Sequence, residues 1–278
     1  MKPRFAICNE TFGDWPWQRV CAAVAGFGYD GIEIAPFTFA PSVEAISPQR
    51  RQEIRQVAED NGLEIVGLHW LLTSPPGLHI HTVDATIRQR TVEYLRHLIH
   101  FAGDIGAGIM VFGSPQQRRL EAGDYAGAWQ RTQDSFRELL PTLRERDVIL
   151  CQEALPGPES DFIMTAAEAA RMVREINDPH FRLMLDMKSM CAETQPAATI
   201  IGEFCPLVEH FHANDANRRG PGFGATDFHP VAAALHDCGF QGYVSVEVFD
   251  YTPDPETIAR ESLRYLKEVF AGTTNEHE

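Results

Sequence analysis

The chain has 278 residues, 44% of them hydrophobic, which is enough for one large α/β domain or two small ones. Its formal charge of −15 argues against a nucleic-acid partner, because binding to phosphates requires a basic surface. No stretch approaches the roughly 20 consecutive apolar residues of a membrane span, and no secretion signal precedes the first strand-like run. We therefore expect a cytoplasmic protein that binds neither nucleic acid nor membrane.

Short apolar, β-rich runs alternate with amphipathic segments eight times along the chain. The expected strands are 4–9, 31–36, 64–70, 108–113, 148–154, 181–187, 208–214 and 243–249. The expected helices are 16–28, 47–61, 83–106, 125–146, 165–177, 197–204, 228–238 and 255–270, most with apolar residues at i, i+3 and i+4. Ser47-Pro48 and Asp254-Pro255 place a capping side chain before a proline in the first helical turn.

Strands that are apolar throughout are buried on both faces, which is typical of a parallel sheet. Eight such units with short loops favour a closed (β/α)₈ TIM barrel over an open doubly wound sheet. An open sheet of the dinucleotide-binding type would also carry a glycine-rich turn after its first strand, and residues 9–13 do not match one. The sequence predicts a single α/β domain over residues 1–272 and a disordered polar tail over residues 273–278.

The six cysteines are scattered and form no CxxC pair. In a chain of this length we interpret them as reduced, buried side chains of a cytosolic protein. The residues concerned are Cys8, Cys21, Cys151, Cys191, Cys205 and Cys238.

Four chemically reactive residues each close a predicted strand: Glu153, Asp186, His212 and Glu247. They lie about one strand–helix repeat apart, and strand ends meet at the mouth of a barrel, where active sites form. A single acid at a strand end often caps the next helix, but several converging carboxylates repel one another unless a cation compensates. Oxygen ligands and one imidazole suit Mn²⁺, Mg²⁺, Co²⁺ or Zn²⁺. The spacing therefore predicts one divalent metal ion bound by these four residues.

The pattern resembles the xylose isomerase-like TIM barrels, a family of sugar phosphate isomerases and epimerases, and in particular the ketose 3-epimerases. The resemblance covers essentially the whole chain and is most specific in Gln152-Glu153, Leu185-Asp186, the run 210–215 (HFHAND) and Val246-Glu247. It implies that the four strand-end residues bind one divalent ion, with Mn²⁺ the first expectation. It also implies a sugar substrate and a homo-oligomer, either a dimer or a tetramer.

Two loop positions match the epimerases by their offset, and one position departs from them. Glu159 and Arg218 fall where those enzymes carry a substrate-contacting glutamate and arginine. Ser189 stands where they carry a substrate-binding histidine, and Lys188 is its neighbour. A solvated loop charge is the ordinary alternative for Glu159 and Arg218. The departure puts simple ketohexose 3-epimerisation in question and leaves the wider family unaffected.

The chemistry implied is removal of a proton next to a carbonyl, with Glu153 and Glu247 as the catalytic carboxylates on opposite faces of the substrate. Return of the proton to the other face gives epimerisation, and movement between carbons gives aldose–ketose isomerisation. His69 and Lys188 are expected to contact the substrate, and Trp15 to form an apolar wall with Trp17. A core histidine and a helix-packing tryptophan are the structural alternatives.

Three other functions remain open from the sequence. One is a metal-dependent lyase, such as a dehydratase acting on a keto-sugar or inosose, which the missing histidine favours. Another is an apurinic endonuclease-like hydrolase, which needs further histidines where Phe112-Gly113 and Ser189 stand and is opposed by the negative charge. The third is a non-catalytic sugar-binding barrel, which would leave the four strand-end residues without a role.

Overall fold

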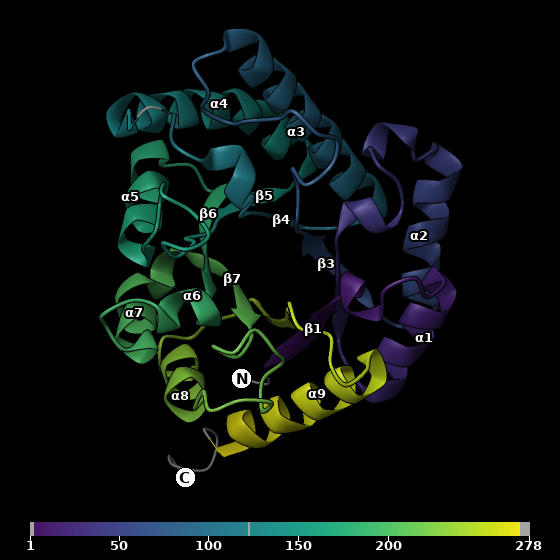
Figure 1. Cartoon of the computed structure of the whole chain (residues 1–278). Coiled ribbons are helices and arrows are strands. Elements are labelled where there is room, and N and C mark those ends of the chain that lie inside the picture. The colour runs from purple at the N-terminus through teal and green to yellow at the C-terminus, as the bar shows by residue number, and fades with distance from the viewer. Residues whose placement is uncertain (1–2, 122, 273–278) are drawn as a thin grey trace.

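Eight parallel strands close into a barrel in the order β1 to β8, and the main helices surround it (Figure 1). The computed structural model describes residues 3–121 and 123–272. The strands are β1 Arg4–Cys8, β2 Gly31–Ile34, β3 Glu64–Leu68, β4 Ile109–Phe112, β5 Ile149–Gln152, β6 Phe181–Asp186, β7 Val208–Ala213 and β8 Tyr243–Val246. Each of them lies within a strand expected from the sequence, which confirms the (β/α)₈ fold.

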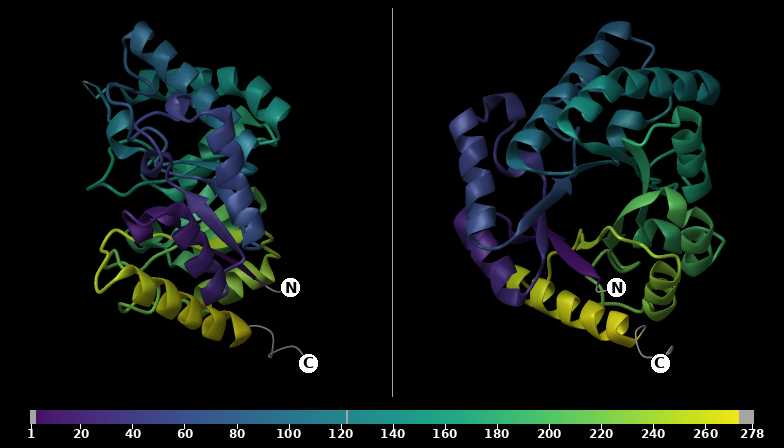
Figure 2. Two further views of the ribbon diagram at one scale, coloured as in Figure 1. Left: turned by 90° about the vertical axis from the view of Figure 1, so that its right-hand side faces the viewer. Right: turned by 180° about the vertical axis from the view of Figure 1, so that it is seen from behind.

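The helices likewise follow the expected segments, and the ring that they form is also seen from behind the barrel (Figure 2). Their bounds are α1 Trp17–Phe27, α2 Pro48–Asp60, α3 Ala85–Ile105, α4 Tyr125–Arg146, α5 Ala166–Ile176, α7 Ala197–Phe204, α8 His229–Asp237 and α9 Pro255–Gly272. The sequence did not predict the short α6 Met187–Cys191 or the 3₁₀ turns η1 Asn9–Phe12, η2 Pro36–Thr38, η3 Val43–Ala45, η4 Pro115–Arg118 and η5 Cys205–Leu207. Among the described residues, none of the helices has the length and apolar character needed to cross a membrane.

Helix ends are set by the signals that the sequence carries. Ser47 accepts a hydrogen bond from the Arg50 N–H at the start of α2, and Asp254 accepts one from the Thr257 N–H at the start of α9. Gly106 ends α3 in the left-handed conformation, with φ 83°. The predicted tail, 273–278, lies outside the described residues, and the extent of the domain stays a prediction.

The interior of the barrel has an apolar lower layer and a polar upper layer. The lower layer is a cluster of buried side chains that point inward from the strands: Ala6, Val66, Ile109, Val111, Cys151, Met184 and Tyr243. Because successive side chains of a strand point to opposite faces, the residue two positions after an inward-pointing one also points inward. Residues that follow this lower layer by two positions therefore line the mouth of the barrel.

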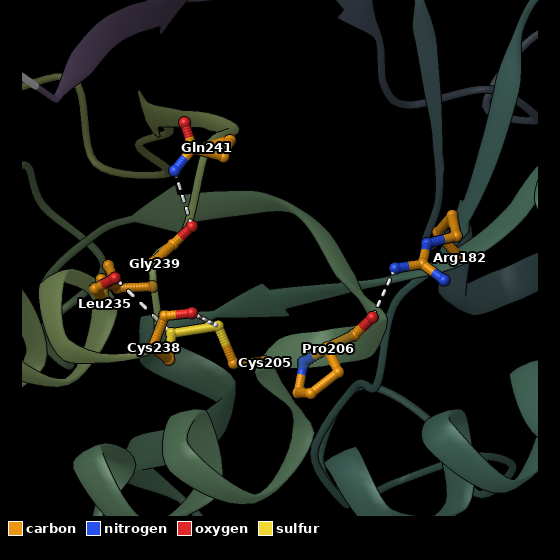
Figure 3. The surroundings of a disulfide bond; sticks show 7 residues. All are labelled: Arg182, Cys205, Pro206, Leu235, Cys238, Gly239 and Gln241. Atoms are coloured by element: carbon orange, nitrogen blue, oxygen red, sulfur yellow. Dashed lines mark hydrogen bonds between the residues drawn. A yellow bond between two sulfur atoms is a disulfide. The ribbon is translucent and has the colours of Figure 1, made fainter. Parts of the chain in front are cut away.

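The expectation of six reduced, buried cysteines is wrong in two respects. Cys205 and Cys238 form a disulfide, and Cys191 is exposed, whereas Cys8, Cys21 and Cys151 are free and buried (Figure 3). Cys205 follows α7 and Cys238 follows α8, and the packing of these two helices brings the Cα atoms to 6.3 Å, within the usual range for a disulfide. The separation of 33 residues gives no sign of this pairing in the sequence.

Candidate metal-binding and catalytic site

The alternation of side chains explains why the four strand-end residues converge. Glu153 lies two residues after Cys151, and Asp186 lies two residues after Met184, so both continue the inward-facing rows of β5 and β6. His212 is paired with Asp186 across β6 and β7, and with Ser245 across β7 and β8. Glu247 follows Ser245 by two residues. The fold therefore directs all four side chains into the barrel mouth.

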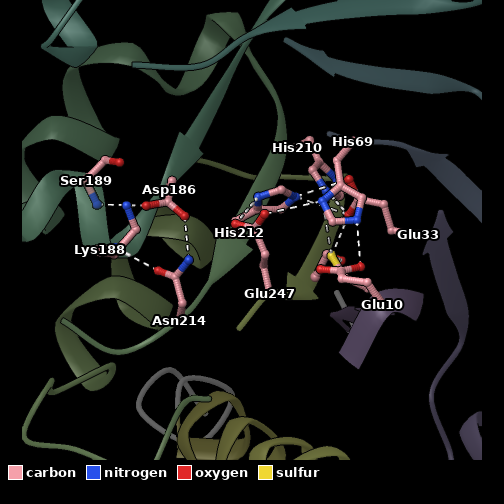
Figure 4. A network of polar contacts seen from close by, with 12 residues as sticks. Glu10, Glu33, His69, Asp186, Lys188, Ser189, His210, His212, Asn214 and Glu247 are labelled. Carbon is pink, nitrogen blue, oxygen red and sulfur yellow. Dashed lines mark hydrogen bonds and ion pairs between the residues drawn. The ribbon is translucent and has the colours of Figure 1, made fainter. Parts of the chain in front are cut away.

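The distances between these groups are those of a small coordination site. One ligand atom each of Glu153, Asp186 and His212 lies within 4.8 Å of the others. The Nδ1 atom of His212 lies 3.1 Å from the Oε2 atom of Glu247 (Figure 4). All four side chains are buried, with 1% to 7% of their surface exposed. Their arrangement is consistent with the predicted ligand set.

Neighbouring groups hold two of the carboxylates in place. Asp186 accepts hydrogen bonds from the Ser189 N–H at 2.7 Å and from the Asn214 amide at 2.5 Å. Gly113 lies beside the Glu153 carboxylate, and a Cβ atom at this position would come within 2.1 Å of Glu153 Oε2. A glycine is therefore needed there for Glu153 to point into the mouth.

The electrostatics of this group favour a bound cation. Burial raises the pKa of Glu153 to about 8, and the charges of Asp186 and Glu247 add to this effect. Burial would also raise the pKa of Glu247, but the charge of His212 and hydrogen bonds from His212 and His69 hold it well below its usual range. His212 Nδ1 and Glu247 Oε2 face each other at 3.1 Å, and neither atom has another hydrogen-bond partner among the described residues. A divalent ion would satisfy these atoms and offset the clustered negative charge, so the residues fit such an ion.

Three buried polar residues with no role predicted from the sequence contact this site or its neighbours: Glu10, Glu33 and His210. Glu33 of β2 is fully buried and lies 2.9 Å from His210 Nε2 and 3.1 Å from His212 Nε2. Glu10 of η1 lies 2.9 Å from His69 Nε2. Glu33 also lies at an irregular point of its strand, because the pairing of β2 with β3 shifts in register between Ile32 and Glu33. A charged residue in the middle of an apolar strand, as in GIEIAP, was the available signal for Glu33.

His69 joins Glu10 to the candidate ligands. Its Nδ1 atom lies 3.3 Å from Glu247 Oε1, and its Nε2 atom faces Glu10. Burial alone would lower the pKa of His69, but the charge of Glu10 and hydrogen bonds to Glu10 and Glu247 raise it to about 10. The imidazole is 1% exposed, and it is one of the groups that line the pocket above Glu153 and Glu247.

Glu159 and Lys188 form an ion pair over the barrel mouth. Lys188 Nζ lies 2.7 Å from Glu159 Oε1 and 5.1 Å from the centre of the Phe249 ring. Glu159 and Phe249 line the same pocket as His69, Glu153 and Glu247, whose apolar walls are Trp70, Val111 and Leu155. The structure therefore brings Glu159, Lys188 and His69 to the four candidate ligands.

Arg218 and Trp15 lie further out. Arg218 is exposed and stacks on the outer side of the mouth, with its guanidinium carbon 5.3 Å from the Phe249 ring centre. Trp15 does not line the pocket of Glu153. It lines a neighbouring one with Glu10, Trp17 and Phe37, and Arg19 stacks on its ring. Ser189 is buried, and its hydroxyl has no hydrogen-bond partner within residues 3–121 and 123–272.

Comparisons with known proteins agree with this architecture. Residues 21–269 match the family described as xylose isomerase-like TIM barrel. The chain is 33% identical over 251 residues to a D-psicose 3-epimerase of Enterocloster bolteae, a match that covers 87% of this chain and 79% of the relative. It is 23% identical over 291 residues to an inosose dehydratase of Serratia proteamaculans, covering 91% and 90% of the two chains. A solved D-psicose 3-epimerase structure in the presence of D-fructose superposes with a TM-score of 0.85 at 22% identity, covering 97% of this chain and 100% of that one, and supports the fold.

Proposed function

Because the chain belongs to the xylose isomerase-like TIM barrel family, we propose that it is a divalent-metal-dependent sugar epimerase of the ketose 3-epimerase type. The observation that carries this proposal is the convergence of Glu153, Asp186, His212 and Glu247 in one buried group at the barrel mouth. This group combines the ligands for a hard cation with two carboxylates that can transfer protons.

Glu153, Asp186, His212 and Glu247 would hold the ion, for which Mn²⁺ is the first choice and Mg²⁺, Co²⁺ and Zn²⁺ are alternatives. The bound ion would supply Lewis acidity, which makes the C–H next to a substrate carbonyl easier to deprotonate. The side chains of Asp186 and His212 are fixed by Ser189, Asn214 and Glu33, which suits a role in binding.

Glu153 and Glu247 would move the protons. They belong to the ends of β5 and β8, with β6 and β7 between them, so a sugar bound at the mouth would lie between the two carboxylates. One carboxylate removes the proton from one face of the carbon, and the other delivers a proton to the opposite face, which inverts the centre. If a single carboxylate moved the proton between neighbouring carbons, the same site would interconvert an aldose and a ketose.

The substrate hydroxyls would be bound by Glu159, Lys188 and His69, which already surround the pocket. Burial raises the pKa of Asp186, the charge of Lys188 opposes this effect, and the same charge would stabilise a substrate oxygen that becomes negative when the proton leaves. Arg218 would contact the outer end of the sugar. Trp15 would form an apolar wall of the neighbouring pocket, which it lines with Glu10, Trp17 and Phe37. Function in the cytoplasm and assembly into a dimer or tetramer stay predictions.

The test is exchange of substrate C–H for deuterium across a panel of ketoses and aldoses with added Mn²⁺. We expect exchange and epimerisation with the wild-type protein, and a loss of about 10³-fold with Glu153→Gln or Glu247→Gln. Metal content must be measured for each variant, so that loss of the ion is not mistaken for loss of the base. Glu145→Gln, an exposed change on α4, serves as the matched control. Full activity in either site variant would remove that residue from the proton transfer.

A lyase is the second candidate, because Ser189 occupies the position of the epimerase histidine and an inosose dehydratase is among the relatives. In that case removal of the same proton would be followed by loss of the β-hydroxyl group, which takes up a proton and leaves as water, and no proton would return to carbon. Assays of keto-sugars and inososes for an unsaturated, ultraviolet-absorbing product separate the two reactions. Product formation without epimerisation would replace the first proposal with the second.

A further inference from the structure

Arg118, at the end of η4, is a fully buried arginine that forms no ion pair. Its side chain is 0% exposed, and no carboxylate of the described residues lies within ion-pair distance of its guanidinium. Burial lowers the pKa of Arg118 to about 10, and the charges of Glu153, Glu159 and Glu168 oppose this effect from beyond contact distance. The hydrogen bonds of Arg118 therefore indicate which part of the structure this buried side chain holds in place.

The guanidinium joins two backbone carbonyls of one loop. Nη1 donates to the Glu153 carbonyl at 2.7 Å, and Nη2 donates to the Ile163 carbonyl at 3.5 Å. Glu153 begins the β5–α5 connection, and Ile163 lies near its end, so the two bonds span the β5–α5 loop (residues 154–164). A planar guanidinium with several N–H donors is suited to such a bridge, whereas a lysine ammonium is not.

The loop has a backbone conformation that needs outside support. Ile163 has φ 53°, in the left-handed region that a β-branched residue rarely adopts. Its carbonyl also accepts the Leu155 N–H at 3.2 Å, which closes the loop upon itself. The neighbours of Arg118 add two more bonds, from Arg119 Nη2 to the Glu159 carbonyl at 3.4 Å and from the Leu120 N–H to Asp161 at 2.9 Å.

Two histidines hydrogen-bond to the backbone of the segment 118–120, which carries Arg118. The imidazoles of His81 and His79 donate to the carbonyls of Arg118 and Arg119, at 2.9 and 3.0 Å. Both histidines belong to the connection between β3 and α3. The β3–α3 connection, the segment 118–120 and the β5–α5 loop thus form one continuous series of contacts that ends at Glu153 and Glu159.

We propose that Arg118 is a positioning residue that fixes the distance between the proton-transferring carboxylate of Glu153 and the Glu159–Lys188 pair. It does so by tying the backbone at Glu153 to the far end of the loop that carries Glu159. The inference rests on the proposed function for its link to catalysis. Its structural part, that Arg118 holds the loop, does not depend on that function.

The test compares Arg118→Lys and Arg118→Met with Leu98→Ala, a cavity-forming change in the buried face of α3. Hydrogen exchange is measured by mass spectrometry on peptides that cover residues 154–164, and kcat and KM are measured for the sugar that the wild-type protein epimerises. For both Arg118 variants we expect exchange in the loop to be at least about tenfold faster than in wild type, with little change in other peptides. We also expect kcat to fall by about 10²-fold with a smaller change in KM, because displaced catalytic groups act mainly on the reacting step.

The Leu98→Ala protein should lose global stability without a selective change in the loop or in kcat. Loop exchange at the wild-type rate in Arg118→Lys would overturn the proposal, as would a loosened loop with unchanged kcat. If Arg118→Met does not fold, Arg118→Lys carries the test, because it keeps the buried positive charge and loses the bridge. If no sugar is turned over by the wild-type protein, the proposed function fails, and hydrogen exchange still decides whether Arg118 holds the loop.

Discussion

Glu33 determines which nitrogen of His212 is free to bind a metal. Both carboxylate oxygens of Glu33 lie 3.1 Å from His212 Nε2. A carboxylate that is ionised can only accept, and the charges of His212 and His210 outweigh burial and hold the pKa of Glu33 well below its usual range. Glu33 therefore holds a proton on Nε2 of the imidazole. Nδ1, which faces Glu247, is the nitrogen that would bind an ion, in place of its own proton.

Replacement of Glu33 should weaken metal binding without removing a ligand. We expect Glu33→Gln to lower the affinity for Mn²⁺ by about 10- to 100-fold, because the amide can no longer accept from both histidines and fix the orientation of His212. Titration followed by electron paramagnetic resonance gives the affinity, and circular dichroism checks the fold. Glu64→Gln, at the opposite end of the barrel, is the control. An unchanged affinity in a folded Glu33→Gln protein would contradict this role.

The contrast between Glu33 and Glu247 shows what a sequence can predict at this scale. Glu247 ends an apolar strand, and the strand ends of a barrel are known to meet, so its place at the site follows from its position. Glu33 lies within its strand, and its partners His210 and His212 are far along the chain. Only closure of the barrel brings β2 opposite β7. The local pattern of apolar and polar residues around Glu33 therefore could not predict its partners.

A buried histidine near the Arg118 segment gives the protein a defined acid sensitivity. Burial lowers the pKa of His81 to about 4 from an ordinary value of 6.5, although the bond to the Arg118 carbonyl opposes this effect. The folded state therefore binds a proton at His81 less readily than the unfolded state. The contribution to stability is complete above pH 6.5 and is lost as the pH falls from 6.5 toward 4.

We expect His81→Gln to flatten the dependence of unfolding free energy on pH over this range by roughly 1 to 3 kcal/mol, since the glutamine cannot be protonated. At pH 7 the variant should be somewhat less stable than wild type, because its packing against Phe162 and its bond to Arg118 change. Urea unfolding between pH 4 and pH 7.5 measures the effect. His100→Gln, a change at a partly exposed position on α3 that has no ion pair among the described residues, is the control. Parallel profiles for His81→Gln and wild type would show that another group is responsible.

Among the elements, α6 shows how a candidate ligand also shapes the chain. Asp186 ends β6 and accepts the Ser189 N–H, so its carboxylate caps the first turn of α6 while it faces the site. This turn directs Lys188 toward Glu159 and buries Ser189. The sequence predicted the strand and the carboxylate, but five residues are too few for a helical pattern to be recognised.

The disulfide ties together two helices on the outside of the barrel. It joins the residue after α7 to the residue after α8 and closes a loop of 33 residues. A cross-link of this length lowers the entropy of the unfolded chain and stabilises a protein by about 3 to 4 kcal/mol. We expect Cys205→Ser with Cys238→Ser to lower the free energy of unfolding by up to this amount and to leave the proposed epimerase activity unchanged.

Denaturant unfolding with and without dithiothreitol measures this effect. Reductant should destabilise the wild-type protein and have no effect on the double variant. If the reductant has no effect on either protein, the two thiols are not bonded in solution. That outcome would agree with the sequence-based expectation of reduced cysteines in a cytosolic protein. Cys21→Ser, a buried thiol in α1, controls for the loss of sulfur from the core.

Over the whole molecule, negative charge is concentrated at the mouth of the barrel. Glu10, Glu33, Glu153, Asp186 and Glu247 are all buried there, in a chain of net charge −15. The opposing groups are His69, His210, His212 and Lys188. Because Lys188 is already paired with Glu159, carboxylates remain in excess. Such a cluster destabilises the folded state unless a cation binds it, and the unfolded chain has no comparable site.

Removal of the proposed divalent ion should therefore lower thermal stability as well as the proposed activity. Binding at 100 times the dissociation constant contributes about 2.7 kcal/mol, which for a domain of this size corresponds to a rise in Tm of about 5 °C. We expect treatment with a chelator to lower Tm by this amount and Mn²⁺ to restore it, whereas an equal ionic strength of KCl should not. In Asp186→Asn, one ligand is weakened and the cluster carries less charge, so Mn²⁺ should shift Tm much less. An ion that binds only the folded state must raise its stability. A Tm that neither chelator nor Mn²⁺ changes would therefore indicate that the strand-end carboxylates hold no metal.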